Sequence, residues 1–322
     1  DLRRWLVGAE GGSRSRSRGL RERIKDLIAS DEKADEILDE LLKSARALPA
    51  TGWSQRLAGG QPSGVAEAFF ALVRTQVYAR DANEPYGYSL ETDTAPPIDG
   101  LLDAAARLDG ALARLGKPVG QLIAALAAKL DTDAADLDSQ TRSRIETVCR
   151  SLERRARQPA AAWRQMLAVL DGETPDDLVD WLAVERWDGR DFDLGLHRHW
   201  VDPTRPFAEA VIEPAHGVVV TSATLRDATG DLEADWKTAE QRTGAVHLAQ
   251  PAELASELSP FDYAENTRVL IIDDVARNNT DQAAAAYREL FLAAGGGGLG
   301  LFTAIARLRA VWDRIAGPLE DA

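Results

Sequence analysis

The sequence of 322 residues contains a single cysteine, Cys149. One cysteine excludes a disulfide framework within the chain, and it also excludes a zinc or iron–sulfur site built on several cysteine ligands. No apolar run approaches the ~18–20 residues that a membrane-spanning helix needs, so we expect no membrane segment. The first residues show no signal-peptide pattern, and we expect a cytoplasmic protein.

Basic residues are scarce relative to acidic ones. The 38 Lys and Arg residues stand against 52 Asp and Glu residues, which gives a formal net charge of −14. This balance excludes a uniformly basic surface that coats nucleic acid, because phosphate binding needs positively charged faces. Local basic patches remain compatible with it. Hydrophobic residues make up 45% of the chain, which is enough to bury a core.

The first part of the chain has the pattern of successive helices. Between Ser30 and Pro49, apolar residues recur every three or four positions; Ser30 can cap this helix, while Asp31 and Glu32 favour its N-terminus. Similar apolar stripes occur at 65–77, 101–115, 145–156 and 163–170. We therefore expect a helical domain over residues 1–188.

The pattern changes to short strands near residue 190. Alternating apolar residues at 192–196 predict a half-buried strand, and the β-branched run at 217–221 predicts a strand covered on both faces. The remaining predicted elements are a strand at 268–273, a helix at 280–293, a strand at 299–302 and a helix at 304–316. This β-α-β-α order is typical of a parallel sheet. The expected fold class is α/β overall and helix-dominated, with incomplete α/β pieces that contain parallel strands.

The predicted strands lack neighbours. Two strands and two helices after residue 259 are too few for a self-contained doubly wound sheet. Either all strands join one small mixed sheet, or their partners lie outside this chain, and we favour the second interpretation. The chain also opens at Asp1 in the middle of an element, so we expect a central fragment of a longer protein.

The sequence lacks a nucleotide-binding motif. A Walker A loop needs Gly-Lys-Ser/Thr after a strand, but the one Gly-Lys pair, Gly116-Lys117, precedes a proline. The glycines at 295–298 precede a predicted strand, and we interpret them as a helix-to-strand connection that tolerates positive φ. Asp273 and Asp274 end a strand-like run as magnesium-binding acids do, but without a Walker A loop a core strand with a polar end is favoured.

Other catalytic and metal patterns are equally incomplete. His197 and His199 share one face of a predicted strand and could offer two metal ligands. No carboxylate is fixed in register with them, so we assign no metal site. No serine occupies a G-x-S-x-G turn, and we recognise no Ser/His/Asp arrangement.

Arginines gather in three groups. The first is Arg14, Arg16 and Arg18, followed by Arg21 and Arg23; the second is Arg150, Arg154 and Arg157, with Arg155 and Arg164 close by; the third is Arg307, Arg309 and Arg314. The second group recurs at helical spacing and could follow phosphates along one helix face. A solvated face, with Glu146 pairing to Arg150, is an equally weighted alternative. The third group follows a predicted strand, where a helix N-terminus also offers amides to an anion.

The segment VVVTSATL at 218–225 ends in Ser-Ala-Thr and resembles motif III of superfamily-two helicases. The neighbouring segments are GLHRHWVDPTRPF at 195–207, EPAHG at 213–217, SPFDY at 259–263, TRVLIIDDV at 267–275 and GGGGLGLFTAIARLRAVWDRI at 295–315. Their order is similar to that of DinG/XPD-type DNA helicases, and to the bacterial DinG-like branch in particular. The resemblance is most specific over residues 190–316.

The resemblance implies a part of an ATP-dependent 5′-to-3′ DNA helicase. Residues 1–188 would form the arch that guides single-stranded DNA, 189–258 the end of the first RecA-like domain, and 259–322 the start of the second. Ser222 and Thr224 match motif III, whose hydroxyls couple ATP hydrolysis to strand movement. The resemblance places Thr303 near the DNA backbone and makes Arg307 a weaker candidate for DNA binding.

The chain departs from the family in several motifs. It lacks a Walker A loop, a DEAH box, the later motifs with their arginine finger, and the four cluster cysteines of many relatives. ATP and Mg²⁺ would then bind mostly to the remaining helicase segments upstream and downstream, and we expect this chain alone to be inactive. The alternative is a non-catalytic helical protein-interaction module fused to a small α/β domain. Much of the negative charge lies at 91–103, 131–138 and 171–193, so it does not exclude DNA elsewhere.

Overall fold

The computed structural model describes residues 2–9, 18–29, 31–80, 89–133, 137–276 and 278–320. The chain divides into two compact units, Asp1–Ala252 and Glu253–Ala322. Helices dominate, and the described residues form one sheet of three antiparallel strands. The expectation of a helix-dominated α/β chain is thus confirmed at this coarse level. None of the described helices combines the length and apolar character that crossing a membrane requires.

The elements of the first unit are, in chain order, α1 (Leu2–Val7), α2 (Leu20–Ile24), α3 (Glu32–Ser44), η1 (Ala45–Ala47), α4 (Trp53–Ala58), α5 (Gly64–Arg80), β1 (Leu90–Asp93), α6 (Leu101–Thr132), α7 (Ser139–Leu152), η2 (Glu153–Arg157), α8 (Gln158–Ala168), β2 (Leu178–Trp187), β3 (Arg190–Trp200), α9 (Thr204–Phe207), η3 (Ala208–Ile212), α10 (Leu232–Thr243) and η4 (Ala245–His247). The segments η2 and η3 are π-helical turns, whereas η1 and η4 are 3₁₀ turns.

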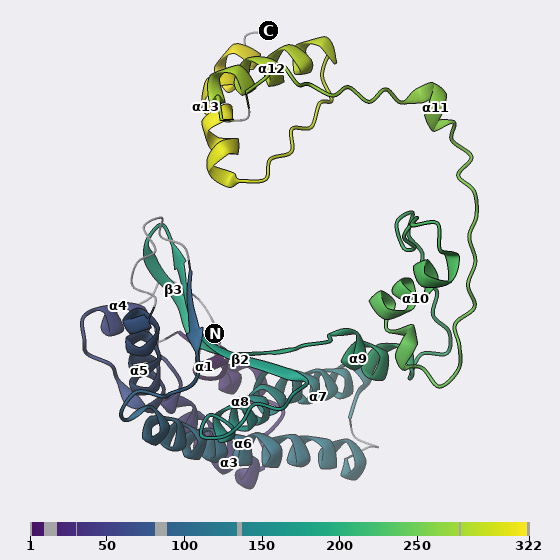
Figure 1. Ribbon diagram of the computed structural model, residues 1–322. Helices are drawn as coiled ribbons and strands as arrows, with labels where there is room; N and C mark the ends of the chain where they lie inside the picture. Colours follow the sequence, from purple (N-terminus) through teal and green to yellow (C-terminus); the bar gives the residue numbers. More distant parts are fainter. Residues whose placement is uncertain are drawn as a thin grey trace. The chain divides into compact units, whose positions relative to one another are not determined.

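The long helix α6 organises the core of the first unit. It packs against α3, α5, α7 and α8, which surround it in Figure 1. Leu108, Leu115 and Leu122 are buried along α6 because they recur every two helical turns. The predicted apolar stripes at 65–77, 101–115 and 145–156 fall in helices, and the stripe at 163–170 lies in α8 up to its end at Ala168, so these helix predictions are confirmed.

The start of α3 differs in detail from the prediction. Asp31 is the N-cap residue, and its carboxylate accepts a hydrogen bond from the Ala34 amide at 3.0 Å. Ser30, the predicted cap, lies outside the described residues. An aspartate is as good an N-cap as a serine, and its negative charge also interacts favourably with the helix N-terminus. Asp31 therefore provides both the cap and the charge.

The sheet has the order β1-β2-β3, and α5 packs against all three strands. The strand predicted at 192–196 is confirmed within β3. Asp188 and Gly189 both have positive φ and form the tight turn between β2 and β3, at the predicted 188/189 domain boundary. A register shift between Glu185 and Arg186 interrupts the alternation, and Phe192 is 71% exposed instead of half-buried.

The described structure does not show the parallel strands that the sequence predicts at 217–221, 268–273 and 299–302. These segments belong to no helix or strand, and Val219, Ile271 and Leu299 are at least 82% exposed. A β-branched run becomes a strand only when a neighbour pairs with its backbone groups. No described segment lies beside these runs in that way.

The second unit contains α11 (Tyr263–Asn266), α12 (Thr280–Ala293) and α13 (Ile305–Glu320). The predicted helices at 280–293 and 304–316 are confirmed as α12 and α13, which pack through Ala283, Ala284, Val311 and Ile315. Gly295, Gly296 and Gly297 after α12 all have positive φ, as the expected connection requires, although no strand follows.

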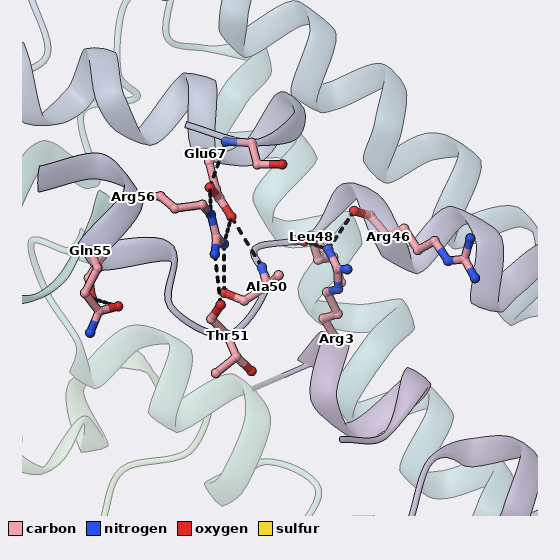
Figure 2. A network of polar contacts seen from close by, with 10 residues as sticks. Arg3, Arg46, Leu48, Ala50, Thr51, Gln55, Arg56 and Glu67 are labelled. Atoms are coloured by element: carbon pink, nitrogen blue, oxygen red, sulfur yellow. Dashed lines mark hydrogen bonds and ion pairs between the residues drawn. The ribbon is translucent and has the colours of Figure 1, made fainter. Parts of the chain in front are cut away.

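A buried carboxylate joins α4 and α5. Glu67 is 1% exposed and pairs with Arg56, which also donates to the carbonyl oxygens of Ala50 and Thr51 (Figure 2). The Ser63 amide donates to the same carboxylate at 2.8 Å. Burial by itself raises the pKa of Glu67, but the hydrogen bonds from Arg56 and Ser63 outweigh burial and hold the pKa below its ordinary value.

Candidate nucleic-acid interface

An arginine hollow lies on the outer face of α7 and η2. Its volume is about 390 Å³, and it is lined by Thr147, Arg150, Ser151, Arg154 and Arg155. Two of the three predicted phosphate-binding arginines of this helix, Arg150 and Arg154, therefore meet at one site. We call this set of five residues the arginine hollow.

The sequence of α7 and η2 determines which side chains face outward. Asp138 caps α7 by accepting a hydrogen bond from the Thr141 amide at 2.7 Å. Ile145, Leu152 and Ala156 are fully buried on the inner face. The polar residues of the same turns must then lie on the solvent side, where the arginine hollow forms.

The π-helical turn η2 changes which arginines share this face. The Gln158 amide donates to the Glu153 carbonyl, five residues back, so the chain gains one residue within the turn. Arg155 consequently lines the hollow, whereas Arg157 does not and pairs with Glu153 at 3.2 Å. The structure therefore does not bring Arg157 together with Arg150 and Arg154.

The arginine hollow carries little compensating negative charge. Arg150 lies 3.9 Å from Glu146 and donates to the Thr147 hydroxyl at 3.3 Å. Among the described residues, no carboxylate lies within 4.0 Å of Arg154 or Arg155.

The arginines that precede and follow the hollow in the sequence, unlike Arg154 and Arg155, have acidic partners. Arg144 and Arg164 each have an aspartate partner at 2.7 Å, Asp26 and Asp109, and these partners raise the pKa of both guanidinium groups. Three converging cations with weak internal pairing suit a bound anion, because guanidinium groups form strong hydrogen bonds with phosphate oxygens.

The predicted motif III residues form a hydroxyl turn at Ser222 and Thr224. The Ser222 hydroxyl accepts a hydrogen bond from the Thr224 amide at 3.1 Å and lies 3.3 Å from the Thr224 hydroxyl. Both residues are exposed. The chain after the turn is held to α10 by Asp235, which is 3% exposed and accepts a hydrogen bond from the Thr229 hydroxyl at 2.6 Å.

Thr303 and Arg307 belong to the second unit and are described separately. Thr303 is exposed two residues before α13, and Arg307 lies in the first turn of that helix. Arg314, from the same predicted group, pairs with Asp281 at 2.6 Å. Arg14 and Arg16 of the first group lie outside the described residues.

The predicted histidine pair packs against a tryptophan. The Trp181 ring is stacked on His197, with ring centroids 5.3 Å apart, and meets His199 edge-on at 4.8 Å. Over the described part of the chain, no group of three or more His, Cys, Asp or Glu side chains is arranged to hold a metal. Asp273 and Asp274 lie in the unpaired stretch that precedes α12.

Sequence reasoning missed part of the arginine hollow. Thr147 and Ser151 were not predicted, although they precede Arg154 by seven and three positions and so lie on its helix face. Arg155 could not be placed there from an ideal helical period, because the π-helical turn is needed to bring it in.

Comparisons with known proteins identify no relative of this chain. No family model, curated protein or solved structure matches the chain. The resemblance to helicases therefore rests on the segments around VVVTSATL and on their order in the sequence.

Proposed function

We propose that this chain is the central part of an ATP-dependent 5′-to-3′ DNA helicase of the DinG/XPD type, acting in the cytoplasm. In this proposal residues 1–188 guide single-stranded DNA as the arch. The observation that carries the proposal is the arginine hollow, where three guanidinium groups converge in a chain of net charge −14. Local positive charge on an acidic chain concentrates the DNA contact at one place.

Three exposed apolar segments outside any helix or strand support the proposed RecA-like pieces. Residues 218–220, 269–272 and 299–301 carry exposed Val, Leu and Ile side chains, which a protein normally covers. We propose that these segments become parallel strands when the remaining helicase segments pair with them. Those segments would also bind ATP and Mg²⁺, because this chain has neither a Walker A loop nor a DEAH box.

The arginine hollow would bind the DNA backbone without reading its sequence. Arg150 and Arg154 can each donate two hydrogen bonds to a phosphate, and the hydroxyls of Thr147 and Ser151 can add further donors. Phosphate contacts position a strand but carry no base information. A helicase needs this kind of binding because it moves along any sequence.

We expect Arg150→Ala combined with Arg154→Ala to weaken binding of the 322-residue chain to single-stranded DNA roughly tenfold, because two phosphate contacts are lost. The measurement is fluorescence anisotropy with a labelled oligonucleotide at several salt concentrations. The slope of the logarithm of the binding constant against the logarithm of the salt concentration should fall by about 1.4 in magnitude, because each phosphate contact to a single strand contributes about 0.7.

Arg157→Ala is the matched control for this measurement. It removes one arginine from the same helical segment, but its guanidinium already pairs with Glu153 and does not line the hollow. We expect its affinity to stay within about twofold of the wild type. Equal losses in the control and in the double variant would show that general charge, and not the arginine hollow, binds DNA.

One observation favours the alternative of a protein-interaction module. Trp187 and Phe192 are 80% and 71% exposed near the tip of the β2–β3 hairpin. Asp191 anchors this tip to α5 by accepting hydrogen bonds from Arg74 at 2.6 Å and from Tyr78 at 2.7 Å. Rigid exposed aromatic residues are common in protein interfaces. A wild-type chain that fails to bind single-stranded DNA would favour this alternative.

A further inference from the structure

Trp5 lies next to the arginine hollow. This residue of α1 is half-buried and packs its remaining surface against the core. The guanidinium carbon of Arg155 lies 5.7 Å from the centre of the Trp5 ring, and that of Arg23 lies 5.9 Å from it. Both distances are within the ~6 Å range of cation–π attraction. Because Arg155 also lines the hollow, the indole and the hollow share one side chain.

The guanidinium groups at Trp5 are available to a ligand. Two other cation–π pairs of the chain involve arginines that contact carboxylates, Arg74 with Asp191 and Arg226 with Asp235. Arg155 and Arg23, in contrast, have no carboxylate within 4.0 Å among the described residues. The Arg23 side chain donates to the Arg18 carbonyl at 3.0 Å, which orients it but leaves its charge uncompensated.

We propose that Trp5, Arg23 and Arg155 form a stacking platform for a nucleobase, beside the arginine hollow that holds the adjoining phosphate. This inference rests on the proposed DNA binding at the hollow and adds the class of ligand. Indole rings and guanidinium planes both stack on bases. Because every base has a flat face, such a platform accepts any sequence.

The platform selects single strands over duplexes. In a duplex each base is covered by its neighbours and its pairing partner, so no free face reaches a protein side chain without unstacking. A single strand offers an unpaired base next to each phosphate. The combination of the hollow and the platform therefore fits an unpaired nucleic-acid strand better than a phosphate alone or a duplex.

The test compares two ligands of equal length and charge, a single-stranded oligonucleotide and the same backbone without bases. We expect the wild-type chain to bind the oligonucleotide about 5- to 150-fold more tightly than the base-free strand, the range of one stacked base. Trp5→Leu should remove most of this preference, whereas Trp5→Phe should keep it because the ring remains. Arg154→Ala should weaken both ligands by the same factor.

The outcomes separate this inference from the proposed function. If the wild type binds both ligands equally and Trp5→Leu changes neither affinity, the platform is refuted while the hollow stands. If the wild type binds neither ligand, the proposed DNA binding itself fails. If Trp5→Leu does not fold, the wild-type comparison and the exposed Arg23→Gln substitution decide. The platform predicts a wild-type preference for the oligonucleotide that Arg23→Gln lowers. Equal wild-type affinities for the two ligands, or a preference that Arg23→Gln leaves unchanged, would overturn the platform.

Discussion

Replacement of Arg56 by alanine is expected to lower the free energy of unfolding of the chain by about 3 kcal/mol. The substitution leaves the Glu67 carboxylate, 1% exposed, without its guanidinium partner. A buried charge that loses its partner costs far more than an exposed one, because a buried carboxylate is poorly hydrated. Chemical denaturation at neutral pH measures this loss.

The control for Arg56→Ala is Arg164→Ala. This arginine also pairs with an aspartate, Asp109, but both side chains of the pair are at least 33% exposed. We expect a loss of less than about 1 kcal/mol for the exposed pair. Equal losses in the two variants would contradict the view that Glu67 and Arg56 form a buried stabilising network (Figure 2).

The same network makes stability depend on pH in a known direction. The pKa of Glu67 in the folded chain lies below its ordinary value of 4.5, because hydrogen bonds from Arg56 and Ser63 outweigh the effect of burial. The carboxylate therefore stabilises the fold above pH ~4.5, and this contribution is lost as the pH falls through the lowered pKa. Glu67→Gln should be less stable than the wild type at pH 7, and the difference should shrink under acid conditions.

The hydroxyl turn is the second place where we expect a large effect. If the chain is part of a helicase as proposed, Ser222→Ala with Thr224→Ala in the intact protein should leave ATP hydrolysis nearly unchanged but lower the unwinding rate on the order of tenfold, which corresponds to the loss of one or two hydrogen bonds. The hydroxyls of Ser222 and Thr224 contact each other at an exposed turn. They can therefore change partners at little steric cost when DNA moves.

Folding and unwinding can be separated in this experiment. Both positions are exposed, so the double substitution should change the free energy of unfolding by less than about 0.5 kcal/mol. Thr238→Ala is the control, because Thr238 is a half-buried threonine on α10 whose hydroxyl donates to the Ala234 carbonyl of its own helix at 3.0 Å. Normal unwinding by the Ser222/Thr224 double variant would refute the assignment of motif III.

The helices could be predicted because their signal is local. The apolar residues of α3 and α6 repeat with the helical period, and Pro49 and Gly295 stand just beyond helical segments. The strand β2 was missed, although Asp188-Gly189 is a strong hairpin signal and the alternation of β3 was seen. A hairpin needs both arms, and the apolar run of β2 does not alternate cleanly.

The predicted strands at 217–221, 268–273 and 299–302 are not formed within the described residues, and for one common reason. Val219 and Ile271 have side chains that favour strands, but a propensity supplies no hydrogen-bond partner. Pairing depends on a neighbouring segment, which the described structure does not provide. The sequence pattern thus indicates a preference for strand conformation, and the structure shows that these segments form no strand when no neighbouring segment pairs with them.

The arginine hollow was predicted in part. Helical spacing placed Arg150 and Arg154 on one face, and the structure brings them together. The same spacing placed Arg157 on that face and Arg155 only close to it. Because of the π-helical turn at Glu153–Arg157, Arg155 lines the hollow and Arg157 does not. No local sequence pattern predicts such a one-residue change in helical phase.

Our central proposal is that single-stranded DNA binds on the face formed by α7, η2 and Trp5. Photo-crosslinking of the chain to an oligonucleotide with photoreactive bases, followed by mass spectrometry, tests it most directly. We expect crosslinks at Trp5 and within residues 147–155, and we expect them to be lost in the Arg150→Ala, Arg154→Ala double variant. Crosslinks confined to other parts of the chain, or unchanged in that variant, would contradict the claim.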